Sequence, residues 1–360
     1  ERDQPAMAES DAAKRAKLDA ALAVPKVELH IHIEGSLQAQ TIFRLARKNG
    51  LLDKLPLKSE EEWTERCKNF ADLGDFLNLY YGGMESLKGR EDFCEMTFAY
   101  LERANADTVR HVEIFFDPQP HVAHGIAVED QVAGMEDAFK MAKEKFGMTG
   151  EIIFCWQRQL GVESAKETLA LMKPFVGRVI GVGADSDYVN GWPEDFKDLF
   201  LEARAAGFKV VGHAGEVPDG GGADNEAMAN FIKNVGPDRV DHGFLCWHNE
   251  TLRKEMIESG LHMTVCPLSN LCLKVVPSLP EHPIAKLLRA GASVGINSDD
   301  PAYLGGFIGA NYQACAEQLD MTTAELCQCS RNAANACFAS PERKAALLAE
   351  IAEFEKARGA

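Results

Sequence analysis

Apolar and ionisable residues alternate along residues 27–36, which read VELHIHIEGS. Successive side chains of a strand point to opposite faces, so the valine, the leucine and the isoleucines would share one face and the glutamates and histidines the other. An edge strand with its polar face in water is the usual origin of such a pattern when nothing else accompanies it. The alternative is a strand that carries a pair of metal ligands inside a barrel.

Seven further strand-like segments follow, separated by stretches with helical periodicity. The expected strands cover residues 109–117, 150–156, 178–185, 208–216, 238–243, 261–270 and 292–300, and the apolar spacing predicts helices at 193–206, 224–235, 248–259 and 281–290. Alternating strands and helices predict an α/β fold with a parallel sheet. Eight such units close most economically into a (β/α)8 barrel, the TIM-barrel fold.

The other segments fit around one barrel domain that covers residues 26–360. Residues 38–105 are expected to be a largely helical insertion after the first strand, and we interpret this insertion as a lid over the barrel mouth. Residues 323–358 are charged and alanine-rich and should form extra C-terminal helices. Residues 1–25 are expected to form a tail or a short helix.

Composition limits the partners that the protein can have. A hydrophobic content of 46% in 360 residues supports a large core and excludes a disordered chain. The net charge of −17 disfavours nucleic acid and anionic membranes as partners. Ten cysteines without a paired framework indicate free thiols, and residues 1–25 lack the apolar core of a secretory signal, so the expected location is the cytoplasm. The sequence leaves the oligomeric state open.

Catalytic groups in such barrels lie at the carboxyl ends of the strands. Several of the expected strands end in histidines or carboxylates, and we expect four of these residues to bind one metal ion: His30, His32, His213 and Asp299. A single histidine at a strand end is usually structural, but several imidazoles buried together without partners would be costly. Three imidazoles and one carboxylate suit Zn²⁺ and leave one coordination position for water.

Five motifs resemble those of the adenosine/adenine deaminase family of metal-dependent purine aminohydrolases. They are ELHIHIEGSL, GHAGE, VDHG, VCPLSN and NSDDPAYLGG, and the resemblance runs in order from about Lys26 to the end of the chain. It implies a (β/α)8 barrel with one catalytic zinc ion per chain, a small-molecule purine as substrate, and release of ammonia from purine C6. The four expected ligands coincide with the ligand pattern of the family.

The same resemblance implies roles for the polar residues around the metal. Glu216 corresponds to the acid that protonates purine N1, and His242 to the histidine that orients the attacking water and helps to deprotonate it. Asp299 would direct that water as well as bind the metal. The expected substrate contacts are Glu34, Ser186 (through its backbone N–H, to N3), Gly215 and Asp300 (to N7).

Glu34 bears on the choice between free base and nucleoside. Adenosine deaminases of the family tend to carry aspartate at this position, where it reaches ribose, whereas adenine deaminases tend to carry glutamate, whose longer side chain would occupy the space of the sugar. The sequence therefore favours adenine in purine salvage. The segment ADSDYVNG (184–191) departs from the adenine branch at Asp187 and Tyr188, so adenosine or an N6-substituted adenine stays as an alternative substrate.

The motifs argue against three other classes of protein. Metal-dependent hydrolases with two metals need a modified lysine on the fourth strand, and the segment GVGADSD has none. Cytidine-type deaminases bind zinc through a P-C-x-x-C pair, which is absent from the sequence. An inactive purine-binding homologue would be expected to have lost the costly polar residues. Every ligand and both proton-transfer residues are present, so we expect an enzyme.

Overall fold

The computed structural model describes residues 11–217 and 223–358, and within them all paired strands run parallel. One sheet has the order β1-β2-β3-β4-β5 and the other the order β6-β7-β8-β9. The strands are β1 (Lys26–His32), β2 (Val109–Phe116), β3 (Thr149–Gln157), β4 (Gly181–Asp185), β5 (Lys209–Val210), β6 (His213–Ala214), β7 (Val240–His242), β8 (Met263–Val265) and β9 (Val294–Ile296).

Backbone hydrogen bonds join the two sheets into one barrel. Val211, which lies between β5 and β6, donates its N–H to the carbonyl of Val182 in β4 at 2.9 Å. On the other side, Asp299 donates to the His30 carbonyl at 3.1 Å and His32 donates to the Asp299 carbonyl at 2.9 Å. The segment after β9 is thus paired with β1. Since β5 and β6 together occupy one strand position, the chain forms the predicted (β/α)8 barrel.

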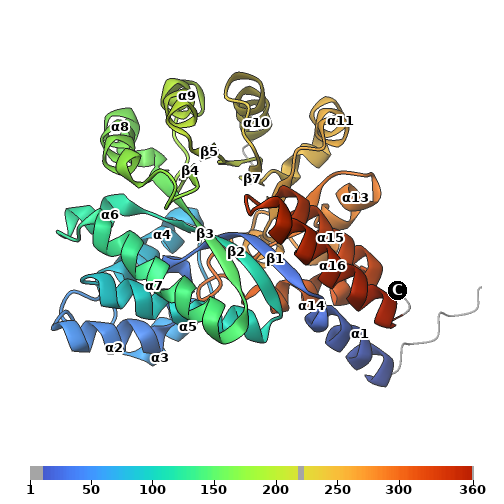
Figure 1. The fold of residues 1–360 in the computed structure, drawn as a ribbon, viewed down its shortest axis with the longest axis horizontal. Coiled ribbons are helices and arrows are strands. Elements are labelled where there is room, and N and C mark those ends of the chain that lie inside the picture. Colours follow the sequence, from blue (N-terminus) through green and yellow to red (C-terminus); the bar gives the residue numbers. More distant parts are fainter. Residues whose placement is uncertain (1–10, 218–222, 359–360) are drawn as a thin grey trace, which may run out of the picture.

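Helices surround the barrel, as the alternating pattern predicts (Figure 1). Figure 1 shows α8 (Gly161–Met172), α9 (Lys197–Ala206), α10 (Ala223–Asn234), α11 (Glu250–Ser259) and α13 (Ile284–Arg289) following one another along the outside. The shorter α6 (Pro118–Ala123) and α12 (Pro267–Cys272) follow β2 and β8, and α7 (Val128–Phe146) packs on β3. The chain ends in α14 (Ile308–Gln318), α15 (Thr323–Ala336) and α16 (Pro341–Arg358), and α1 (Asp11–Ala23) packs against α14. None of the helices in the described part of the chain is long and apolar enough to cross a membrane.

Four helices occupy the segment between β1 and β2: α2 (Ala39–Asn49), α3 (Glu60–Arg66), α4 (Leu73–Met84) and α5 (Arg90–Ala106). The Asp72 side chain starts α4, because its carboxylate accepts a hydrogen bond from the N–H of Asp75. Phe76 and Tyr80 on α4 are buried, and α5 packs against α7. That these helices act as a lid stays a prediction at this point.

The burial of β1 decides between the two interpretations of the opening segment. All seven residues of the strand are buried, with Glu28 and His30 at 0% and His32 at 6% exposure. The edge-strand interpretation is therefore wrong, because the ionisable side chains point into the barrel instead of into water. The apolar residues of β1, among them Leu29 and Ile31, belong to the main hydrophobic core.

Candidate active site

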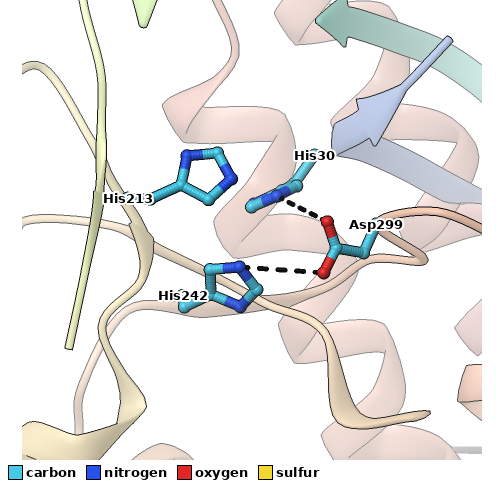
Figure 2. A group of neighbouring side chains, drawn as sticks. All are labelled: His30, His213, His242 and Asp299. Atoms are coloured by element: carbon cyan, nitrogen blue, oxygen red, sulfur yellow. Dashed lines mark ion pairs between the residues drawn. The ribbon is translucent and has the colours of Figure 1, made fainter. Parts of the chain in front are cut away.

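Three imidazoles and one carboxylate meet at the carboxyl ends of the strands (Figure 2). His30 comes from β1, His213 from β6 and His242 from β7, while Asp299 follows β9. The Nε2 atom of His30 lies 3.2 Å from Oδ1 of Asp299, and Nε2 of His242 lies 3.7 Å from its Oδ2. Each of the four residues offers one potential ligand atom, and these atoms lie within 4.8 Å of one another. The cluster thus has the size of a single metal site.

His32 belongs to the same cluster. Its Nε2 atom lies 3.2 Å from Nε2 of His213 and 3.5 Å from Oδ1 of Asp299. The structure therefore brings together all four residues that were predicted as ligands, with His242 beside them. Which of the five binds the metal stays a prediction.

Neighbouring groups hold the imidazoles so that their Nε2 atoms face the centre. The Nδ1 atoms of the three predicted ligands are within reach of the Thr264 hydroxyl (His30, 2.9 Å), the Asp185 carboxylate (His32, 3.4 Å) and the Ala184 carbonyl (His213, 3.1 Å). Such partners fix the orientation of the rings that bind a metal. Nε2 of His30 is buried and has no hydrogen-bond partner in the protein. A buried nitrogen that makes no hydrogen bond and lies beside other imidazoles and a carboxylate fits a divalent cation.

The backbone is strained at three positions around this cluster. His242, Asp299 and Ser186 have φ angles of 62°, 65° and 66°, in the left-handed region that residues with a Cβ seldom adopt. The strain at Asp299 is held by its two backbone hydrogen bonds to β1. Strain of this kind costs about 1–3 kcal/mol per residue and concentrates at functional sites.

Glu216 and His242 form an ion pair next to the cluster. Oε2 of Glu216 lies 2.9 Å from Nε2 of His242. Burial alone would raise the pKa of Glu216, but His242 and Arg158 lower it overall. Burial likewise opposes the charge on His242, but Glu216 raises the pKa of His242 to about 9. Through this contact the two residues can exchange a proton.

A small pocket opens beside these groups. One wall consists of the α4 residues Leu73, Phe76, Leu77 and Tyr80. His32, His213, Glu216, His242 and Asp299 also line the pocket, and so do two of the predicted substrate contacts, Ser186 and Asp300. Oδ1 of Asp300 is buried without a hydrogen-bond partner, and burial raises the pKa of this carboxyl well above its usual range. A ligand with a hydrogen-bond donor would satisfy that oxygen.

The two other predicted contacts lie outside the set of lining residues. Glu34 is buried behind Asp117: its Oε1 accepts hydrogen bonds from the Asp117 N–H at 3.2 Å and from His121 Nε2 at 2.9 Å. Gly215 has a φ of 70°, and a Cβ there would lie 2.7 Å from the sulfur of Met228. This position therefore needs glycine, which lets the chain turn between His213 and Glu216.

Sequence reasoning missed two carboxylates in the pocket. Asp117 follows β2 and Asp185 ends β4, and both line the pocket. Burial and then the charge of Glu34 raise the pKa of Asp117 to about 7, while burial and Asp117 raise the pKa of Asp185 well above its usual range. Both residues end predicted strands, so the strand-end rule that identified the ligands would have found them too. Tyr188, which departs from the family pattern, packs on Arg158, and its hydroxyl bonds Asp224.

Comparisons with known proteins agree on one family. Residues 25–354 match the family described as "Adenosine deaminase". The chain is 41% identical to an adenine deaminase of Sphingopyxis alaskensis, over 91% of this chain and 94% of that protein. It is 42% identical to an adenine deaminase of Rhodospirillum rubrum, over 92% of this chain and 96% of that protein.

Solved structures give the same result. The adenine deaminase of Arthrobacter aurescens superposes with a TM-score of 0.88 at 38% identity. The superposition covers 93% of this chain and 100% of the Arthrobacter aurescens chain. An amidohydrolase of Burkholderia ambifaria with bound Zn superposes with a TM-score of 0.86 at 27% identity, covering 99% of this chain and 96% of that one.

Proposed function

The chain belongs to the adenosine deaminase family, and from this membership we propose that it hydrolyses adenine to hypoxanthine and ammonia with one bound zinc ion, in purine salvage. The observation that carries the proposal is the contact between Glu216 and His242 beside the cluster of His30, His32, His213 and Asp299, at the edge of a pocket. Hydrolysis at an aromatic carbon needs an activated water and an acid for the ring, and this arrangement offers both within one pocket.

In this proposal His30, His32, His213 and Asp299 hold the zinc ion. Zinc in such a site is a Lewis acid that lowers the pKa of water toward neutrality. Zinc is favoured over other metals because the donor set is rich in imidazole and because the similar amidohydrolase of Burkholderia ambifaria contains Zn. His242 is assigned to the water, since its Nε2 faces both Glu216 and Asp299.

The side chains around the pocket complete the chemistry. Glu216 delivers a proton to N1 of the purine, which lets the ring accept electrons when C6 is attacked. Asp299 accepts a hydrogen bond from the attacking water and directs it. His242 first passes its own proton to Glu216 through their contact, and the neutral imidazole then takes up the proton of that water. Asp300 faces N7, and the N–H of Ser186 faces N3. Loss of ammonia from the tetrahedral carbon then restores the aromatic ring.

Adenine is proposed over adenosine for two reasons. The relatives with about 40% identity over nine-tenths of the chain are adenine deaminases. In addition, Oε1 of Glu34 is occupied inside the protein, because His121 and the Asp117 N–H both bond this oxygen. Asp117 and Asp185 stand in the pocket with raised pKa values, so their carboxyls can both donate hydrogen bonds to the ring nitrogens and accept them from the N–H groups of a free base.

The test is ammonia release from adenine and from adenosine by the unmodified protein and by Glu216→Gln. We expect the unmodified protein to prefer adenine and to contain one zinc per chain by elemental analysis. The variant should keep its metal and lose a factor on the order of 10² or more in kcat, because the acid for N1 is gone. Normal turnover in the variant would contradict the role of Glu216. Equal use of adenine and adenosine would mean that the protein is not specific for the free base.

A further inference from the structure

Among the residues that the structure describes, Arg158 is the one cation that extends from the end of β3 on the pocket side of the barrel. It directly follows β3, and its side chain is fully buried at 0% exposure. A buried guanidinium has to satisfy several N–H donors, and its fixed planar geometry determines where the acceptors must lie. The partners of Arg158 are therefore informative about its role.

These partners are the ends of the neighbouring strands. Nε donates to the Asp185 carbonyl at 3.0 Å, one terminal nitrogen donates to the His213 carbonyl at 3.0 Å, and the other donates to the Ser186 carbonyl at 2.6 Å. The same terminal nitrogen lies 3.4 Å from Oε1 of Glu216. Arg158 thus links the end of β4 and the start of β6 to the carboxylate that faces the pocket.

The guanidinium of Arg158 also lies over two aromatic rings. Its central carbon lies 4.8 Å from the centre of the Tyr188 ring and 5.3 Å from that of Trp192. The Tyr188 hydroxyl bonds Asp224, whose other oxygen accepts the N–H of Val217 at 3.0 Å, directly after Glu216. Stacking favours arginine over lysine at this site, because an ammonium has no planar face.

We propose that Arg158 is a positioning residue for Glu216, and that it determines which of the two carboxylate oxygens carries the transferable proton. Arginine can only donate hydrogen bonds. Oε1, which faces Arg158, is therefore kept as an acceptor, and Oε2, which faces His242, is the oxygen that receives a proton from His242 and passes it to the purine. This inference rests on the proposed function, in which Glu216 protonates the purine. No atom of Arg158 needs to touch the substrate.

The bond to Ser186 gives Arg158 a second part in the same task. Ser186 has a positive φ of 66°, and its carbonyl is bound by the terminal nitrogen that also reaches Glu216. One nitrogen therefore sets the distance between the acid and the strand end that is proposed to face N3. A purine clamped at N1 and N3 needs that distance to be fixed, since an error of about 1 Å can cost a factor near 10² in rate.

The experiment is a double-mutant cycle with Arg158→Met, Glu216→Gln and the combined variant, assayed with adenine. Arg158→Met should lower kcat by about 10- to 100-fold with a smaller change in KM, keep its zinc, and alter the pH profile of kcat. Arg158→Lys should recover part of kcat, because an ammonium can still donate to Oε1. The combined variant should be no slower than Glu216→Gln alone.

The control is Arg239→Lys, which alters a fully buried arginine at the opposite end of the barrel, where it pairs with Glu113. It should lower the melting temperature without changing kcat or its pH profile. Defects that multiply in the combined variant, or loss of zinc from Arg158→Met, would overturn the role of Arg158 while leaving that of Glu216 intact. Normal turnover by Glu216→Gln would instead overturn the role of Glu216, and the absence of ammonia release from adenine by the unmodified protein would overturn the proposed function. If Arg158→Met does not fold, the cycle with Arg158→Lys gives the same decision.

Discussion

Glu34 shows how one buried carboxyl can influence substrate choice without lining the pocket. Its pKa is raised to about 8, mainly by burial. Oε1 accepts from His121 and from the Asp117 N–H, while Oε2 has no partner in the protein. Glu34 thereby fixes Asp117, which does line the pocket. Glu34 would therefore act on substrate choice by holding Asp117 in place, and not by filling the space of the sugar itself.

The first prediction concerns Glu34→Asp. The shorter side chain should withdraw from His121 and from the Asp117 N–H, so that Asp117 relaxes and the pocket admits a sugar. We expect the ratio of kcat/KM for adenosine over adenine to rise by about 10-fold or more, with some loss of adenine activity, because buried polar groups that lose their partners are what enforces such discrimination. The measurement is this ratio in both proteins.

Glu34→Gln is the matched control, because it keeps the length of the side chain. It should leave the ratio near that of the unmodified protein, since one amide oxygen can still accept the two hydrogen bonds. A ratio that stays constant in Glu34→Asp would mean that Glu34 has no part in selecting the base.

The sequence predicted those site residues that lie at strand ends within recognisable motifs. The structure places five of them together: His30, His32, His213, His242 and Asp299. The sequence did not identify Arg158 or His121, because their roles depend on contacts with residues that are distant in the chain. Arg158 contacts strand ends 27 to 58 residues away, and His121 contacts a glutamate 87 residues away. No local pattern encodes such distances.

At the scale of elements, α4 is the helix that closes the pocket. Four of its residues line the pocket, and Tyr81 on the same helix bonds the Ser186 hydroxyl and accepts a hydrogen bond from Gln159 at 3.1 Å. These polar bonds tie the inserted helices to the ends of β3 and β4. They support the interpretation of the segment 38–105 as a lid, which remains a proposal.

The second prediction follows from this tie. Tyr81→Phe removes the hydroxyl but keeps the ring, so α4 should open more readily while its apolar contacts persist. Loss of these two hydrogen bonds, worth about 0.5–1.5 kcal/mol each, should raise KM for adenine by about 5-fold or more and change kcat less. Steady-state kinetics will measure both. Gln159→Met, which deletes only the weaker donor, should shift KM in the same direction by less. A fall in kcat at constant KM would place Tyr81 in the chemical step instead.

The eight strand positions and the outer helices were predicted from periodicity. The interruption of the fifth strand was not, and the expected strand 261–270 was too long, because β8 ends at Val265 and α12 begins at Pro267. The segment 208–216 was expected to be one strand, whereas the structure has β5 and β6 with Val211 and Gly212 between them. Gly212 has Phe231 directly above its Cα, where a Cβ would lie 2.8 Å from the ring. The close approach of that ring is a tertiary contact, so the apolar run alone gives no sign of it.

At the scale of the whole molecule, a buried ion pair closes the barrel at the end opposite the pocket. Glu113 on β2 pairs with Arg239, which precedes β7 across the barrel, and both side chains are fully buried at 0% exposure. The Glu113 carboxylate also accepts the N–H of Phe338 between α15 and α16, and the Phe338 ring lies 4.0 Å from the Arg239 guanidinium. One carboxylate thus connects two sides of the barrel with the C-terminal helices.

The last prediction tests whether this pair controls the stability of the barrel. Glu113→Gln leaves Arg239 as an uncompensated buried charge, which should lower the free energy of unfolding by about 3–5 kcal/mol at pH 7. Asp137→Asn is the control, since it removes an exposed pair with Arg90 and should cost about 0–1 kcal/mol. Chemical denaturation of the three proteins at equal metal content gives both values.

The pH dependence of this difference provides a second criterion. Burial alone would raise the pKa of Glu113, but Arg239 and His111 lower it from 4.5 to about 2. Because the folded state binds the proton less tightly than the unfolded chain, the contribution of Glu113 is complete above pH 4.5 and is lost as the pH falls toward 2. The gap between the unmodified protein and Glu113→Gln should therefore narrow between pH 4.5 and about 3, while the small gap for Asp137→Asn changes little. A gap that stays constant over this range would mean that Glu113 stabilises the barrel through packing and not through its charge.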